Sequence, residues 1–114
     1  NNNIYYVDYA DNLYCVVEDE WNLLSENTLS STMTYDGILY YVSADHILYT
    51  CSDEGNFEPV AENVYYIRSS GNDVYYWANE RNAGWGVEVY SVYGKNEGED
   101  FKLISDSLRY DYSF

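Results

Sequence analysis

The sequence Ile4-Tyr5-Tyr6 returns as Leu39-Tyr40-Tyr41 and again as Val74-Tyr75-Tyr76, so that each tyrosine recurs after 35 residues. A fixed period of this size is typical of a repeat architecture, in which each repeat buries its apolar surface against its neighbours. We therefore expect a single domain of three repeats, over residues 1–36, 37–72 and 73–114.

Each repeat has four short apolar segments in the same order. They are rich in β-branched and aromatic residues and are bounded by Asp, Asn, Ser and Gly, which predicts strands. No window carries the i, i+3, i+4, i+7 apolar stripe of a helix. In the three repeats the segments are 4–7, 38–42 and 74–77; Leu13-Tyr14, Leu48-Tyr49 and Val89-Tyr90; 23–26, 59–62 and 103–106; and 29–35, 64–69 and 108–112.

The first strand of each repeat is apolar on both faces, because Ile4 and Tyr6 alternate with Tyr5 and Val7. A strand of this kind lies between two layers. Four short strands in about 35–42 residues, repeated, are typical of a β-propeller blade. We expect an all-β, β-propeller-like fold with three four-stranded blades. A twelve-stranded sandwich is the alternative, which explains the alternation but not the period.

The chain begins inside a repeat, so the expected blade order is three strands, four, four and one final strand. Propellers have about four blades or more. Three blades therefore form either half of a six-bladed ring or a fragment of a longer propeller. The expected partner is a second copy of the chain or the missing blades of a parent chain. In a ring of two copies, the last strand of one completes the first blade of the other. The residues expected at this closure are Leu108, Tyr110, Tyr112, Ile4 and Tyr6.

The run from Ile4 to Asp8 resembles the Ile-Tyr-Trp-Thr-Asp signature of YWTD propellers, as in lipoprotein-receptor ectodomains. A closer similarity is to propeller repeats of bacterial cell-surface proteins, which are rich in hydrophobe-Tyr-Tyr and Leu-Tyr pairs. The chain departs from the signature in having Tyr6 in place of Trp, and Asp8 becomes Ser43 and Ala78 in the later repeats. The resemblance implies the fold and an extracellular or cell-surface location.

The charge balance is 20 acidic against 5 basic residues, a formal net charge of −15. Nucleic acid is not an expected partner because phosphate contacts need Lys and Arg, and no apolar run is long enough for membrane insertion. The acidic clusters at 18–20 and 97–100 are interpreted as solvated turns, because consecutive acids diverge rather than converge on a cation. We expect neither a metal nor a cofactor.

The two cysteines, Cys15 and Cys51, are one step out of alignment in the repeat, so they are expected on opposite faces of their strands, buried and without a disulfide. The single histidine, His46, stands at a turn and has no nucleophile with it in the sequence. Motifs of hydrolases, phosphate loops and metalloproteases are absent from the sequence. We therefore expect no catalytic residues and no enzyme activity.

An insertion makes the third repeat different. Tyr6 and Tyr14 are eight residues apart in the first repeat, and Tyr41 and Tyr49 are eight apart in the second. In the third repeat Tyr76 and Tyr90 are 14 apart, so six residues are inserted, at about Asn79–Gly86. Longer loops on rigid scaffolds tend to carry function. Trp85, Asn82 and Arg81 are the ligand-binding candidates, and the flat indole of Trp85 suits a sugar ring or a protein groove. Alternatively, Trp85 folds back over the end of the blade.

Three functions remain open. The first is a non-enzymatic scaffold that binds protein or carbohydrate at a bacterial surface. The second is a structural module whose whole role is blade-to-blade oligomerisation, as in a homodimer. The third is a propeller hydrolase or lyase, which would need catalytic groups converging from several blades.

Overall fold

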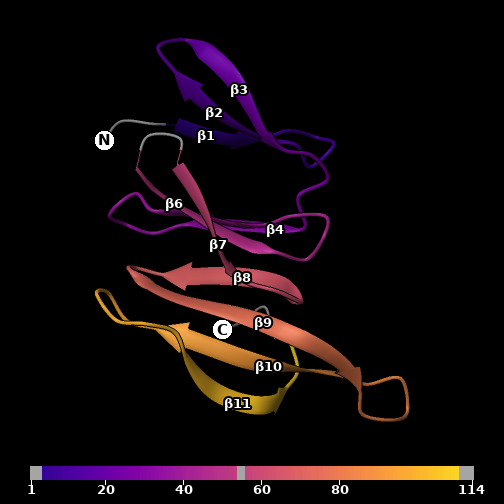
Figure 1. The fold of residues 1–114 in the computed structure, drawn as a ribbon. Coiled ribbons are helices and arrows are strands. Elements are labelled where there is room, and N and C mark those ends of the chain that lie inside the picture. The colour runs from indigo at the N-terminus through magenta and orange to yellow at the C-terminus, as the bar shows by residue number, and fades with distance from the viewer. Residues whose placement is uncertain (1–3, 54–55, 111–114) are drawn as a thin grey trace.

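The computed structural model describes residues 4–53 and 56–110, and every element in them is a β-strand. The strands form three antiparallel sheets, which stack in sequence order (Figure 1). We call them sheet A (β1-β2-β3), sheet B (β4-β5-β6-β7) and sheet C (β8-β9-β10-β11). The strands are β1 (Ile4–Val7), β2 (Leu13–Val17), β3 (Glu20–Ser25), β4 (Ser30–Met33), β5 (Leu39–Val42), β6 (Leu48–Asp53), β7 (Asn56–Ala61), β8 (Val64–Ser70), β9 (Asp73–Asn82), β10 (Glu88–Lys95) and β11 (Lys102–Leu108).

The sheets contain three, four and four strands, in the order that the repeat phase predicts. The segments at 29–35 and 64–69 lead into sheets B and C as β4 and β8. The expected last strand at 108–112 does not begin at Leu108. Leu108 instead ends β11, because the long strand β10 offers Tyr90 as its pairing partner. Tyr112, the third residue expected at the closure, lies outside the described residues.

The strand register corrects one part of the repeat alignment. In all three sheets a tyrosine of one strand lies opposite a tyrosine of the next; the pairs are Tyr6 with Tyr14, Tyr41 with Tyr49, and Tyr76 with Tyr93. The pair of the third repeat that corresponds to Leu13-Tyr14 and Leu48-Tyr49 is therefore Val92-Tyr93 and not Val89-Tyr90. The two tyrosines of a pair are eight residues apart in the chain in sheets A and B and 17 apart in sheet C. The insertion therefore has nine residues and not six.

The inserted residues lengthen two strands rather than one loop. The expected loop at Asn79–Gly86 is wrong in its first half, because β9 continues to Asn82, which pairs with Glu88 of β10. Only residues 83–87 form the connection. The result is a long hairpin that projects from sheet C (Figure 1).

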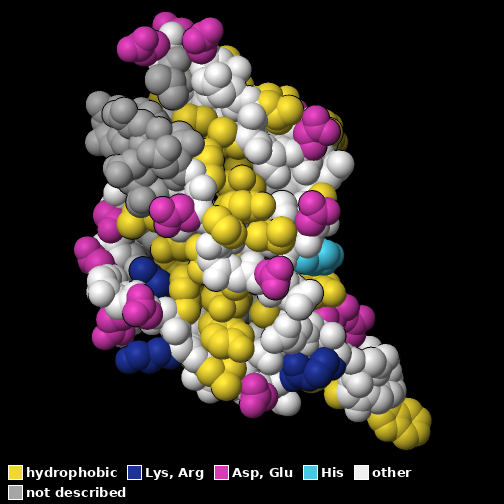
Figure 2. Space-filling view, in the orientation of Figure 1, with side chains coloured by type: hydrophobic (Ala, Val, Ile, Leu, Met, Phe, Trp, Pro, Cys, Tyr) yellow, Lys and Arg dark blue, Asp and Glu magenta, His cyan; other side chains and the backbone are white. Residues whose placement is uncertain are grey.

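Two apolar layers hold the stack together. Between sheets A and B, Leu13 packs with Leu39, Tyr41 and Cys51. The layer between sheets B and C is larger and joins Tyr40, Val42 and Leu48 to residues of β8 and β9, among them Ile67, Val74 and Tyr76. Every residue of β5 is buried, as expected for a strand between two layers. Hydrophobic side chains consequently run as a band along the stack (Figure 2).

An aromatic trio recurs on the same face of all three sheets, which in sheets B and C is turned toward the preceding sheet. The trios are Tyr6, Tyr14 and Trp21 in sheet A; Tyr41, Tyr49 and Phe57 in sheet B; and Tyr76, Tyr93 and Phe101 in sheet C. In sheets B and C the two tyrosines stack, with centroids 5.3 and 4.9 Å apart, and the phenylalanine meets the first tyrosine edge-on. In sheet A, Trp21 stacks on Tyr6 at 5.0 Å and meets Tyr14 edge-on. Each such pair adds roughly 0.5–1.5 kcal/mol beyond the area it buries.

Both cysteines are buried, and neither forms a disulfide in the part of the chain that the structure describes. They lie on opposite faces of their own sheets, but they do not point apart, because opposite faces of successive sheets meet. Cys15 lies opposite Tyr5 in sheet A, and the Tyr5 hydroxyl reaches Cys51 Sγ of sheet B at 3.8 Å. Burial, and after it the charge of Cys51, raises the pKa of the Cys15 thiol. Both thiols therefore belong to the layer between sheets A and B.

The buried tyrosines predict loss of stability in alkali. Burial raises the pKa of Tyr41 and Tyr90 and raises that of Tyr76 to about 12 from an ordinary 10.0. The folded chain keeps these protons after the unfolded chain releases them. The stabilising contribution of Tyr76 is therefore complete below about pH 10 and is lost between about pH 10 and pH 12. Tyrosinate absorbance should show a late step that coincides with loss of the circular dichroism of the strands. Complete ionisation of all tyrosines with that signal intact would contradict the packing.

Candidate functional site

Trp85 stands at the tip of the β9–β10 hairpin and is fully exposed, at 102%. It has a positive φ of 60°, between Gly84 and Gly86, whose φ values are 99° and 73°. The tip is closed by backbone hydrogen bonds from Val87 N to Gly84 O (3.0 Å) and from Ala83 N to Val87 O (2.7 Å). The indole therefore does not fold back over the end of the sheet, as the alternative interpretation would require.

The other two binding candidates serve the hairpin itself. Arg81 donates to the Asn79 carbonyl at 2.8 Å, to Ser91 Oγ at 3.2 Å and to the Asp106 carbonyl. The Asn82 side-chain oxygen accepts a hydrogen bond from Gly84 N at 2.7 Å. These contacts brace the strands below Trp85. The three predicted residues share one hairpin, but Trp85 is the one that projects from it.

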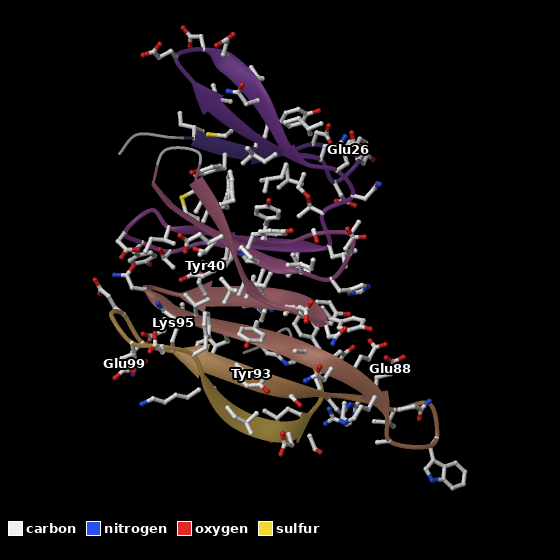
Figure 3. All side chains as sticks on the ribbon, viewed as in Figure 1. Glu26, Tyr40, Glu88, Tyr93, Lys95 and Glu99 are labelled. Atoms are coloured by element: carbon white, nitrogen blue, oxygen red, sulfur yellow. The ribbon has the colours of Figure 1, made fainter. Side chains whose placement is uncertain are left out.

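A carboxyl pair on the outer part of the hairpin strands, Glu80 and Glu88, was not predicted. Tyr90 donates to Glu80 Oε2 at 2.8 Å, and a hydrogen bond with Glu80 raises the pKa of Glu88, which Figure 3 labels. A cleft of about 360 Å³ lies beside it, lined by Tyr66, Gly86, Val87, Glu88, Tyr90, Arg109 and Tyr110. In a chain with 20 acidic residues, sequence spacing does not single out such a pair.

The outer face of sheet A is apolar and open. We call it the A face: Ile4, Tyr6, Tyr14, Trp21 and Leu23. Four of these are exposed, Ile4 by 52%, Tyr6 by 48%, Trp21 by 59% and Leu23 by 50%. Their counterparts in sheet B are covered by sheet A; Leu39 is exposed by 2% and Tyr41 by 6%. Contiguous apolar surfaces of this kind mark interaction sites.

The outer face of sheet C closes the other end of the stack. We call it the C face: Tyr66, Tyr75, Trp77, Ile104 and Tyr110. The Tyr110 ring stacks on Tyr66 with centroids 3.8 Å apart and meets the buried Trp77 edge-on at 5.1 Å. Arg68 Nη1 donates to the Tyr110 hydroxyl at 3.4 Å. Tyr110, expected at the closure, therefore lies on an end of the stack.

Position 94 on the C face requires a glycine because two side chains approach its backbone closely. A Cβ at this position would lie 2.6 Å from Ile104 Cδ1 and 2.7 Å from the Tyr75 ring. A side chain there would push both away from the strand. The glycine thus lets Ile104, itself 53% exposed, lie across the sheet next to Tyr75.

A third feature is a slot along the edge of sheet A. A cleft of about 140 Å³ lies beside β1, and its lining is mostly apolar. Val7 and Met33 are exposed there by 49% and 40%. The lining residues are Tyr5, Val7, Leu13, Ser31, Thr32, Met33 and Leu39.

The single histidine has a structural role. His46 has a φ of 64° in the turn before β6, its Nδ1 lies 3.1 Å from the Val64 carbonyl, and its ring contacts Tyr65. In the part of the chain that the structure describes, no group of three or more His, Cys, Asp or Glu is placed to hold a metal ion. No helix in that part is long and apolar enough to cross a membrane.

Comparisons of this chain with protein-family models, with curated proteins and with solved structures find no match. A function is therefore inferred from three features of the molecule: the A face, the C face and the hairpin tip.

Proposed function

We propose that this chain is a non-enzymatic scaffold of the β-propeller type, in which sheets A, B and C are blades. Its role is to assemble blade against blade through the A face and the C face. The observation that carries this proposal is the aromatic trio, which is covered by a preceding sheet twice and stands open once. A surface that the chain buries twice by the same means is suited to a third sheet of the same kind.

The two internal layers indicate what would cover the open trio. In each, the strand that carries the Tyr-Tyr pair presents a tyrosine to the next sheet. Tyr5 of β1 lies in the layer toward the trio of sheet B, and Tyr40 of β5 lies in the layer toward that of sheet C. Figure 3 labels Tyr40 and Tyr93 on the two sides of that second layer. Tyr75 is the counterpart of Tyr5 and Tyr40, and it lies on the C face. The C face thus offers the A face a partner of the kind seen inside the stack.

Charge favours a head-to-tail contact between two copies. Residues 1–36, which include sheet A, carry seven acidic and no basic residues. All five basic residues lie on sheet C or directly after it: Arg68, Arg81, Lys95, Lys102 and Arg109. Acidic side chains accordingly stand at the sheet A end in Figure 2, and basic ones gather toward the sheet C end. An A face meeting another A face would bring together two ends without a basic residue. Sheet C carries its five basic residues among seven acidic ones over residues 64–110, so a C face offers the A face some opposite charge. Two copies joined in this way at both ends would make a six-bladed ring, within the known range of propellers.

A second candidate function is glycan contact by the hairpin tip, in the setting of a bacterial surface. It is favoured by the full exposure of Trp85 on a hydrogen-bonded turn, which presents the flat indole ready-made. The hairpin leads away from the stack, so this contact is compatible with assembly through the A and C faces (Figure 1).

Trp21→Glu should break the assembly. It places a charge in the middle of the A face, where central aromatic anchors are worth about 2 kcal/mol or more, so we expect the dissociation constant of the dimer to rise at least ~30-fold. Sedimentation equilibrium over a range of concentrations measures it, against a mass of 13.3 kDa for one chain. Trp85→Glu, an equal change at the hairpin tip, is the control and should leave the mass unchanged. A single-chain mass for the unmodified protein at every concentration, or equal effects of the two variants, would contradict the proposal.

Trp85→Ala should separate binding from folding. Because the side chain makes no covering contact at the tip, the free energy of unfolding in urea should change by less than about 0.5 kcal/mol. If the tip binds glycans, titration with cello- and chito-oligosaccharides should change the tryptophan fluorescence of the unmodified protein and not that of the variant. Unchanged emission of the unmodified protein with both sugar series would count against glycan contact.

A further inference from the structure

We propose that the segment that begins at Arg109 in one copy adds to β1 of a second copy, as the innermost fourth strand of sheet A. This rests on the proposed assembly of the C face on the A face. It goes further, because it says that strands are exchanged and in which register. The occupant of the slot beside β1 is thereby a stretch of this same chain.

The slot stands where sheets B and C each have a strand. In those sheets β4 lies beside β5 and β8 lies beside β9. Among the described residues, sheet A has no strand beside β1 on that side. The apolar cleft of about 140 Å³ lies at this edge, with Val7 half-exposed in it. An open edge strand accepts an added strand through main-chain hydrogen bonds, and a neighbouring cleft takes the side chains.

The segment at Tyr110 has the chain position of the missing strand. In each sheet the last strand has one residue that pairs with the buried Leu or Val before the second tyrosine. These residues are Ser25, Ala61 and Ser105, which pair with Leu13, Leu48 and Val92. Five residues after the first two stand Ser30 of β4 and Tyr66 of β8, the inner strands of the next sheets. Five residues after Ser105 stands Tyr110.

Tyr110 also has the spatial position of an inner strand. Inside the stack, β4 lies against β8: Ser30 Oγ contacts Ile67 N at 3.1 Å and Ile67 O at 3.2 Å, and Thr32 Oγ1 lies 2.6 Å from Ser69 Oγ. Tyr110 in turn lies against β8, stacked on Tyr66 and bound by Arg68. Tyr110 thus follows β8 in the stack as β8 follows β4. It lies where the inner strand of a fourth blade would begin.

The register of sheets B and C sets the expected pairing. Ser30 pairs with Val42, and Tyr66 pairs with Trp77. Val7 is the counterpart of Val42 and Trp77, since each of the three lies opposite the buried hydrophobe of the next strand; these hydrophobes are Leu13, Leu48 and Val92. Tyr110 of one copy should therefore lie directly opposite Val7 of the other. Directly opposed residues of antiparallel strands have Cα atoms about 4.5–5.5 Å apart, which suits a disulfide.

The test is a chain that carries both Val7→Cys and Tyr110→Cys, oxidised mildly at a concentration where the protein is assembled. We expect a covalent dimer on a non-reducing gel, and mass spectrometry should find positions 7 and 110 linked between copies of different isotope label. The control carries Val7→Cys and Trp85→Cys, which places the second thiol at an exposed site away from the slot. The paired variant should form at least about ten times more covalent dimer than the control, because disulfides form only at the right Cα separation.

The possible results distinguish strand exchange from the stacking of the A face and the C face, on which it rests. If the variant has a dimeric mass but gives no link between copies, strand exchange is wrong while the stacking of faces stands. If the mass is that of one chain, both proposals fall. A link between positions 7 and 110 within one copy would also overturn the exchange. Should Tyr110→Cys fail to fold, hydrogen–deuterium exchange of the unmodified protein decides. Amides of Ile4–Val7 should become protected as the concentration rises, and concentration-independent exchange would overturn the proposal.

Discussion

The molecule depends on the contact between the aromatic trio of one sheet and the strand that carries the Tyr-Tyr pair in the preceding sheet, which is β1 in sheet A and β5 in sheet B. It occurs between sheets A and B and again between sheets B and C. A four-residue strand such as β5 gains little from its own hydrogen bonds in water, but it is stable when both faces are buried. The period of 35 residues exists because each repeat must offer both halves of this contact.

The same requirement explains the properties of the two ends. Each sheet carries the aromatic trio on one face and the partner tyrosine on the other. A stack therefore leaves one unused half of the contact at each end: a trio at one end and a partner-tyrosine face at the other. At the sheet A end the unused half is the open A face. At the sheet C end it is partly covered by Tyr110, which the chain places over Trp77 as it leaves β11. The nine inserted residues are built into the β9–β10 hairpin, which leads away from the stack and leaves the internal layers unchanged.

Much of the fold could be predicted from the sequence, because side-chain alternation and turn residues are local signals. β1 has the predicted bounds, and the predicted third segments are equivalent in the structure, because their first residues, Leu23, Pro59 and Leu103, pair with Tyr14, Tyr49 and Tyr93. The second strand of the third repeat was misplaced by three residues, since Val89-Tyr90 and Val92-Tyr93 have the same pattern and pairing register alone distinguishes them. The opposite faces of Cys15 and Cys51 were predicted correctly, but their meeting in one layer was not, because alternation fixes a face and only the stacking order tells which faces meet. The hairpin tip was found through its glycines, whereas the A face needed three-dimensional burial, because Trp21 and the covered Phe57 look equivalent in sequence.

The most direct test of assembly through the trio is small-angle X-ray scattering of the unmodified chain over a range of concentrations. The three-sheet stack has a Cα radius of gyration of 14.5 Å and a longest extent of 49 Å. We predict a radius of gyration that rises above this value with concentration and then becomes constant, as two copies close on each other. A constant value near that of the single stack at all concentrations would contradict this assembly, and so would growth without limit, which would mean an open filament instead of a closed ring.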